Sequence, residues 1–167
     1  MVEQWAKIRR FGGGDDMKAS TMDSVNIEDR RDATWIRYDM LVDINSNSRT
    51  ADEELEREEF YGQLQNIFVV HFPCSPRIGV NSETTFFLAG IQKCADIEFR
   101  NGMRMPYYKK MGGYEVVDVG CVQCLIGRIQ ATPTHTAIID RHGALQRSFY
   151  VNDDANAVVN DNLIDGE

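Results

Sequence analysis

One stretch without a Lys, Arg, Asp or Glu, residues 60–72 (FYGQLQNIFVVHF), most constrains what this chain can fold into. Its aromatic and β-branched side chains alternate with period two, and such side chains lose rotamer freedom in a helix, so we expect a long central strand. The even-numbered apolar positions, expected on one face, are Phe60, Leu64, Phe68, Val70 and Phe72. The odd-numbered ones, expected on the other face, are Tyr61, Ile67 and Val69. Gly62 is the expected bulge or bend in this strand.

The rest of the chain supplies strands that we expect to lie against this one. They cover residues 5–10, 17–21, 34–44, 84–99, 114–130, 135–140 and 144–151. Residues 45–59 are expected to form a loop or a weak helix, because they offer almost no apolar stripe that could dock on a core. We expect residues 60–72 and 84–99 to be antiparallel neighbours, with Phe68 and either Phe86 or Phe87 in the core.

Turns rich in glycine and proline separate these segments, which favours an all-β fold. We predict a single domain over residues 4–151, a barrel or sandwich of about seven mostly antiparallel strands with long polar loops. A chain of 167 residues is long enough to bury one such core. Residues 152–167 are expected to form a disordered acidic tail.

The net charge of −8 is concentrated in two short segments. Residues 51–60 hold six acids and one Arg, and residues 152–167 hold five acids and no base, so each contributes −5 and the remainder carries about +2. We interpret both segments mainly as solvated surface, with docking on a basic partner as the alternative. Without a membrane-spanning run or a secretory leader, the protein is expected to be intracellular, or a piece of a longer chain.

Cys121 and Cys124 form an isolated C-x-x-C pair. The pattern favours buried structural thiols, with half of a zinc site and a redox pair as alternatives. On a regular strand, residues three apart point to opposite faces, which opposes a shared metal. We therefore predict that the protein binds no metal.

No catalytic constellation stands out in the sequence. The histidines are scattered, and no serine or cysteine lies in a nucleophile motif. The triple glycine of residues 12–14 lacks the Lys-Ser/Thr of a phosphate-binding loop, so it is interpreted as a turn. We expect no catalytic residue, no cofactor and no small-molecule ligand.

The candidate binding surface is residues 99–110 (FRNGMRMPYYKK). Cations beside aromatic rings are typical of single-stranded nucleic-acid binding, because the cations contact phosphates and the rings stack on bases. The candidate residues are Arg100, Arg104, Tyr107, Tyr108, Lys109 and Lys110, joined by Lys7, Arg9 and Arg10 if the first strand lies nearby. The alternative is that the aromatic residues belong to the core and the cations form a solvated rim.

Several segments together resemble a known group of proteins. They are WAKIRRFGGGDDMKAST (5–21), IEDRRDATWIRYDMLVDIN (27–45), EFYGQLQNIFVV (59–70), YEVVDVGCVQCLIGRI (114–129) and AIIDRHGALQRSFYV (137–151). They are similar to the β-rich C-terminal domain of uncharacterised fungal, especially mushroom, proteins derived from transposons. The order of the YGQL and FYV strands also resembles the β-domain beside plant transposase-type proteins, and the bromo-adjacent-homology type of chromatin module.

This resemblance covers nearly all of residues 4–151 and implies a binding module rather than an enzyme. The implied partners are DNA, RNA or chromatin, or other chains of a transposition complex, and the implied location is the nucleus. The catalytic acids of a transposase would lie in another domain. The rival hypothesis is a structural or oligomerisation domain that uses an uncovered edge or face of the central strand; an enzyme of unknown type is the least favoured.

Overall fold

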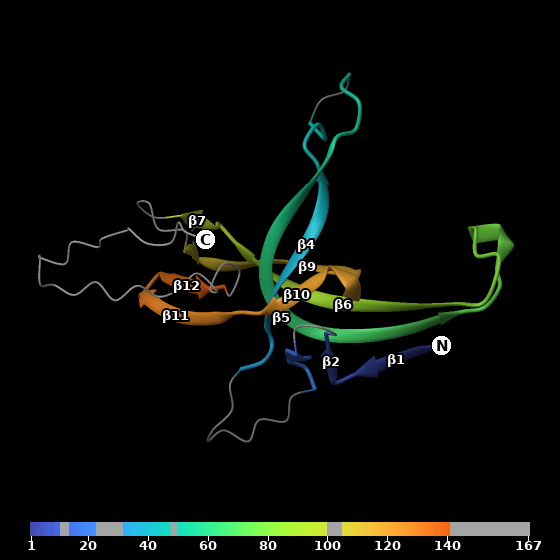
Figure 1. Ribbon diagram of the computed structural model, residues 1–167, viewed down its shortest axis with the longest axis horizontal. Coiled ribbons are helices and arrows are strands. Elements are labelled where there is room, and N and C mark those ends of the chain that lie inside the picture. Colours follow the sequence, from blue (N-terminus) through green and yellow to red (C-terminus); the bar gives the residue numbers. More distant parts are fainter. Residues whose placement is uncertain (11–13, 23–31, 48–49, 100–104, 141–167) are drawn as a thin grey trace, which may run out of the picture.

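The computed structural model describes residues 1–10, 14–22, 32–47, 50–99 and 105–140 of the chain (Figure 1). Apart from two single-turn 3-10 helices, η1 (Pro76–Ile78) and η2 (Val119–Cys121), the regular structure of these residues is strand. The all-β prediction is therefore confirmed. The expected strand at 144–151, the acidic tail, and the candidate residues Arg100 and Arg104 lie outside the described residues.

The strands form three antiparallel sheets. The main sheet has the order β10 (Val122–Leu125), β4 (Trp35–Asp43), β5 (Leu55–Phe72), β6 (Thr84–Ala95) and β9 (Lys110–Asp118), with β1 (Val2–Trp5) also paired to β5. The second has the order β11 (Gly127–Thr132), β12 (His135–Ile139), β8 (Pro106–Tyr108) and β7 (Glu98–Phe99). A small sheet pairs β2 (Lys7–Arg9) with β3 (Asp16–Lys18). The strands of the described residues do not close into a barrel, so of the two predicted architectures the sandwich fits.

The central strand is longer than predicted, because β5 starts at Leu55. Residues 55–59 pair with residues 39–43 of β4, from Asp43–Leu55 to Asp39–Glu59. The prediction of a loop or weak helix here was wrong. A strand held by a hairpin partner needs no apolar stripe, because its backbone hydrogen bonds supply the pairing.

A bulge at Gln65, not at Gly62, divides the central strand. Leu64 pairs with Ile91 and Asn66 with Gly90, which leaves Gln65 without an opposite residue. The bulge shifts the alternation by one, so Leu64 and Ile67 both point into the same core although they have opposite parity. The expected pairing of residues 60–72 with 84–99 is confirmed from Gly62–Lys93 to Phe72–Thr84.

The predicted core phenylalanines were wrong, for two different reasons. Phe68 follows the bulge and is only half-buried, on the face opposite to Ile67. Phe86 and Phe87 are 39% and 44% exposed, because they lie where the β5–β6 hairpin extends beyond the body of the protein (Figure 1). Each of them packs edge-on against one aromatic neighbour, Phe72 and Trp5 respectively.

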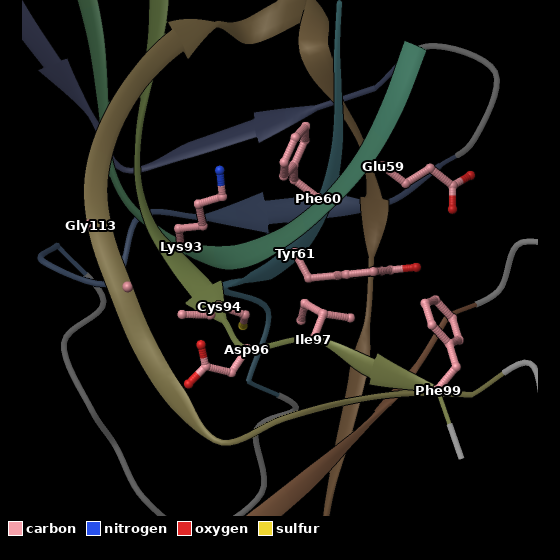
Figure 2. A pocket seen from close by; sticks show the side chains of 11 residues that line it. Glu59, Phe60, Tyr61, Lys93, Cys94, Asp96, Ile97, Phe99 and Gly113 are labelled. Atoms are coloured by element: carbon pink, nitrogen blue, oxygen red, sulfur yellow. The ribbon is translucent and has the colours of Figure 1, made fainter. Parts of the chain in front are cut away.

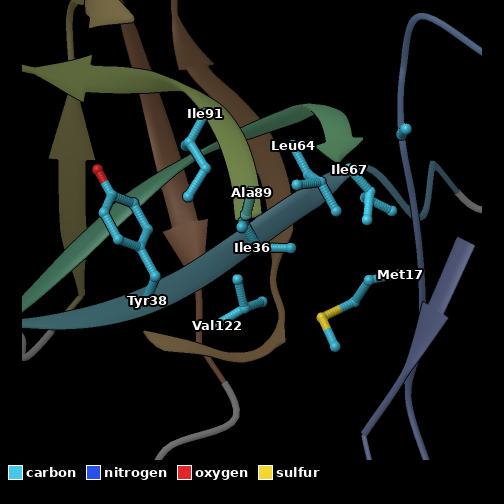
Figure 3. Close-up of a cluster of buried hydrophobic side chains, with 9 residues drawn as sticks. Met17, Ile36, Tyr38, Leu64, Ile67, Ala89, Ile91 and Val122 are labelled. Atoms are coloured by element: carbon cyan, nitrogen blue, oxygen red, sulfur yellow. The ribbon is translucent and has the colours of Figure 1, made fainter. Parts of the chain in front are cut away.

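Two cores lie on opposite faces of the main sheet. Figure 3 shows the first, which gathers side chains from β3, β4, β5, β6 and β10: Met17, Ile36, Tyr38, Leu64, Ile67, Ala89, Ile91 and Val122. The second joins the main sheet to the four-stranded sheet and contains Trp35, Tyr61, Cys94, Tyr108, Ile126 and Ile138. Tyr61 and Leu64 thus reach different cores from the same strand.

Two hairpins extend from this body (Figure 1). Residues 39–43 and 55–59 form what we call the acidic hairpin, which rises from the end of the main sheet at β4 and β5. Residues 66–72 and 84–90, with β1 paired along β5, form what we call the distal arm. Gly62 lies between the two hairpins, at the N-terminal end of the segment of β5 that pairs with β6.

Gly62→Ala is expected to lower the free energy of unfolding by about 1–3 kcal/mol, because overpacking shifts the backbone. A Cβ at Gly62 would lie 2.6 Å from Ile91 Cγ2 and 2.7 Å from the backbone oxygen of Gln92. Gly90→Ala is the matched control: its Cβ meets the hydroxyl end of Tyr114, a side chain that is 46% exposed and can move aside by giving up one hydrogen bond to Asn66 Oδ1. Urea denaturation of both variants checks this, and equal losses would contradict it.

Candidate functional site

A pocket opens where β5 and β6 separate. Their pairing ends at Gly62–Lys93, yet β5 continues along β4 and β6 continues along β9 as far as Ala95–Lys110. Asp96, the next residue, has a positive φ of 55° that turns the chain away toward β7. Gly112 and Gly113 of β9 lie where the register with β6 shifts between Gln92 and Cys94. The separation of the two strands therefore creates the space.

The cavity measures about 420 Å³ and combines aromatic, aliphatic and acidic side chains. It is lined by Glu59, Phe60, Tyr61, Lys93, Cys94, Ala95, Asp96, Ile97, Phe99, Gly112 and Gly113 (Figure 2). Tyr61, Ile97 and Phe99 lie on one side of β5, whereas Phe60 and Lys93 lie on the other (Figure 2). Phe99 is 67% exposed, so the mouth of the cavity presents an aromatic ring to solvent.

The carboxylates and rings of this pocket are suited to a cation. Phe60 already makes a cation–π contact, with Lys93 Nζ 4.1 Å from its ring centre. Lys93 is also held by Glu115, 3.7 Å away. On the other side of β5, Tyr61, Phe99 and Asp96 also line the cavity, with Asp96 and Phe99 at opposite ends of it (Figure 2). The ion pair of Asp96 with Lys110 (3.1 Å) is exposed to solvent on both partners. Exposed ion pairs are weak, so a ligand's ammonium or guanidinium can compete for Asp96.

A buried ion cluster fixes the wall of the pocket. Arg37, only 7% exposed, places its Nη1 3.1 Å from Asp140 Oδ2 and 3.6 Å from Glu59 Oε1. Burial alone would lower the pKa of Arg37, but the surrounding carboxylates, Asp140 first, outweigh it and raise the pKa. Arg37 is therefore a permanent cation beneath the pocket.

Tyr61 is held in the wall by the same cluster. Its hydroxyl donates a hydrogen bond to Asp140 Oδ2 at 3.3 Å. Burial and then the charge of Asp140 raise the pKa of Tyr61 well above its usual range, so the phenol stays protonated and keeps donating. The ring orientation is thus set before any ligand arrives.

The residues predicted to bind nucleic acid are engaged within the protein. Lys109 pairs with Glu98, and Lys110 pairs with Asp96. Lys7 and Arg9 both pair with Asp16, and Arg10 donates a hydrogen bond to the backbone oxygen of Gln123 at 2.8 Å. Lys7 and Arg9 lie on β2 of the small sheet, whereas Tyr107 and Tyr108 lie on β8 of the four-stranded sheet and Lys110 lies on β9 of the main sheet. The predicted residues therefore do not share one sheet.

Tyr108 is not a surface residue. It is 7% exposed in the second core and stacks on Trp35, with ring centres 6.1 Å apart. A base therefore has no access to its ring, which corrects this part of the predicted surface. Tyr107, its neighbour on β8, is half-buried. For Tyr108 the alternative interpretation, an aromatic residue that belongs to the core, describes the structure.

The two cysteines of the C-x-x-C pair do not lie on one regular strand. Cys121 ends η2 and Cys124 lies in β10, with a register shift between Val122 and Cys124. Their side chains therefore need not point to opposite faces, as they would on a regular strand. Their surroundings differ nonetheless: the Cys124 thiol lies 3.7 Å from Asp140 Oδ1, and Cys121 lies beside Asp118. Among the described residues, no cluster of three or more metal-binding side chains is found.

Cys124 is expected to resist alkylation near neutral pH, whereas Cys74 reacts. The thiolate is the reacting species, and burial, followed by the charge of Asp140, raises the pKa of Cys124 to about 11. The Cys74 side chain is exposed. Mass spectrometry after brief treatment of the native protein with iodoacetamide checks the order, and the rate at Cys124 rises as the pH approaches its pKa. Equal modification of both thiols at neutral pH would contradict it.

Sequence reasoning missed the pocket because its residues come from separated segments. Glu59 was assigned to a solvated acidic loop, and Asp96 and Phe99 to a long strand. The acidic composition of residues 51–60 was the available signal, since docking on a basic partner was the alternative considered for it.

Comparisons with protein-family models, curated proteins and solved structures return no match to this chain. In the described residues, none of the helices has the length and apolar character needed to cross a membrane.

Proposed function

We propose that this chain is a non-catalytic binding module that holds a basic segment of a partner polypeptide in the pocket between β5 and β6. The observation that carries the proposal is the pocket itself, in which Tyr61 and Phe99 lie with the carboxylates of Glu59 and Asp96. Aromatic faces and carboxylates both attract a lysine or arginine side chain. The basic tail of a chromatin protein and a basic chain of a transposition complex are partners of this kind.

Charge supports a basic polypeptide over a nucleic acid. The acidic hairpin beside the pocket includes residues 55–59, which are part of the segment 51–60 that carries −5, and such a surface repels phosphate. Five of the cations proposed for nucleic-acid contact are already engaged: Lys7, Arg9, Arg10, Lys109 and Lys110. Asp16, Glu98 and Asp96 lie beside four of these cations and offset the charge that the cations would present to a phosphate. The transposon origin and nuclear location stay predictions based on the resemblance.

The test is the affinity of a fluorescent peptide that alternates lysine with threonine, measured by anisotropy. Phe99→Ala and Asp96→Asn are each expected to weaken binding by about 0.5–2 kcal/mol, roughly two- to thirtyfold. Glu83→Gln, an exposed acid between β5 and β6 at the far end of the distal arm, is the matched control and keeps the affinity of the parent. The proposal fails if the pocket variants bind like the control, or if a single-stranded oligonucleotide binds more tightly than the peptide.

A second candidate function, oligomerisation, is favoured by one face of the distal arm. The register places Val2 opposite Val70, Val70 opposite Phe86, and Phe68 opposite Leu88, so these side chains share a face. Val116 and Tyr114 of β9, both about half exposed, extend this face beyond Gly90. Asp118, opposite Leu88, is the one charged residue that the register of these paired strands places on this face, and its carboxylate accepts a hydrogen bond from the Gly120 N–H. Large uncovered apolar faces mark interaction sites.

A second copy of the chain is the occupant that suits this largely uncharged face. Phe86→Glu is then expected to convert dimers to monomers in sedimentation velocity. Phe87→Glu introduces the same charge on the opposite face of the same strand and leaves the assembly unchanged. A wild-type chain that stays monomeric at high concentration would exclude this candidate.

A further inference from the structure

We propose that the partner segment binds as an added β-strand along the open edge of β5, over residues 55–61. This inference rests on the proposed function and specifies how the polypeptide is held. The edge is continuous with the pocket, since Glu59 and Tyr61 belong to both. The recognised element is therefore an extended basic segment rather than a single side chain.

The backbone of residues 55–61 has a partner on one side. On that side β4 pairs with each of them, from Asp43–Leu55 to Arg37–Tyr61. On the other side pairing with β6 begins only at Gly62–Lys93, and no described strand continues it toward Leu55. In an antiparallel pair, alternate residues direct their N–H and C=O groups away from the partner, so this edge offers a row of backbone donors and acceptors.

The chain makes room for a strand at this edge. β6 remains with β9 after it leaves β5, and Asp96 turns the chain toward β7. A strand added to β5 lies about 4.8 Å from it and extends from the acidic hairpin into the cavity. Gly62 closes the far end of this space, because β5 and β6 approach closely there.

The side chains of the edge select a basic strand. Alternation places Glu56 and Glu58 on the face of Phe60, and Glu59 on the face of Tyr61. Arg57 is the one base of this edge, and it is occupied by Asp39, which accepts a hydrogen bond from its Nε at 2.9 Å. Opposite charges on facing cross-strand positions attract, whereas a second acidic edge is repelled. Charge complementarity thus favours a lysine- or arginine-rich strand over another copy of this edge.

The experiment uses the full chain and the lysine–threonine peptide in three forms: unmodified, N-methylated at every lysine, and N-methylated at every threonine. Methylation removes the backbone donors of one edge of an extended peptide and keeps its charge. Strand addition predicts that one methylated form loses at least about tenfold in affinity while the other keeps the parent affinity. A register slip by two residues does not change this result, because the N–H groups of all lysines still face one edge of the peptide and those of all threonines the other.

A charge exchange supplies the second arm. Glu56→Lys combined with Glu58→Lys is expected to reverse the preference, so that a glutamate–threonine peptide binds better than the lysine–threonine peptide. If Phe99→Ala weakens binding while both methylated peptides bind like the parent, the pocket stands and strand addition is wrong. If no form of the peptide binds the wild-type chain, both the proposed function and this inference are overturned.

Discussion

Arg37→Ala is expected to cost about 3–5 kcal/mol of unfolding free energy, the largest loss from any single change we predict. The guanidinium is 7% exposed and lies among Asp140, Glu59 and Asp39, at 3.1, 3.6 and 3.8 Å. Its removal leaves Asp39 and Asp140, whose side chains are 6% and 10% exposed, without their buried counter-charge. A charge desolvated in this way costs far more than the ion pair contributes when intact.

Lys109→Ala is the matched control, since Lys109 pairs with Glu98 and both side chains are exposed, at 41% and 44%. Its loss is expected to stay below about 1 kcal/mol, as for other exposed ion pairs. Urea denaturation of both variants at one ionic strength makes the comparison. Similar losses for the two variants would contradict the description of a buried cluster centred on Arg37.

Leu64→Ala is expected to lower the free energy of unfolding by about 2–5 kcal/mol, the range for a large residue truncated in a packed core. Leu64 is fully buried in the first core. Phe68→Ala removes a larger side chain and is nevertheless expected to cost less, because Phe68 lies on the other face beyond the bulge at Gln65 and is half-buried. If chemical denaturation shows a larger loss for Phe68→Ala than for Leu64→Ala, the alternation of inward and outward side chains would continue through β5 without a bulge.

Much of the fold was predictable because strand periodicity is a local signal. The segments at 34–44, 60–72 and 135–140 are strands with shifted ends, because their alternating apolar residues match a half-buried sheet. The segment at 84–99 is divided by the turn at Asp96 into β6 and β7, which belong to different sheets. The bulge was not predictable, since Gln65 looks like any exposed strand residue and only the pairing with Ile91 and Gly90 reveals it. One unpaired residue then moved Phe68 out of the expected core.

The acidic hairpin shows the converse limit. Residues 55–59 hold three glutamates and one arginine, a composition that disfavours both a strand and a core. Pairing with residues 39–43 overrides that preference, because the hairpin supplies backbone hydrogen bonds, which a residue's strand propensity does not include. The sequence therefore indicated that residues 55–59 are acidic, but not that they form part of an unpaired edge of β5.

The candidate site was the least predictable part. Clustering along the sequence drew attention to residues 99–110, where two lysines and two tyrosines are neighbours. In the structure each of these lysines has an acidic partner, and Tyr108 packs under the sheet. Tyr61, Asp96 and Phe99 line one pocket only because β5 and β6 separate on the N-terminal side of Gly62. This separation depends on tertiary structure and has no local sequence signature.

The most direct test of the central claim is an NMR titration of the full chain with the lysine–threonine peptide, following every backbone amide. The account predicts that the shifts gather on residues 55–61, Asp96 and Phe99, and that a single-stranded oligonucleotide leaves these amides unchanged. Shifts that gather instead on Tyr107, Lys109 and Lys110, and grow with the oligonucleotide rather than the peptide, would contradict it.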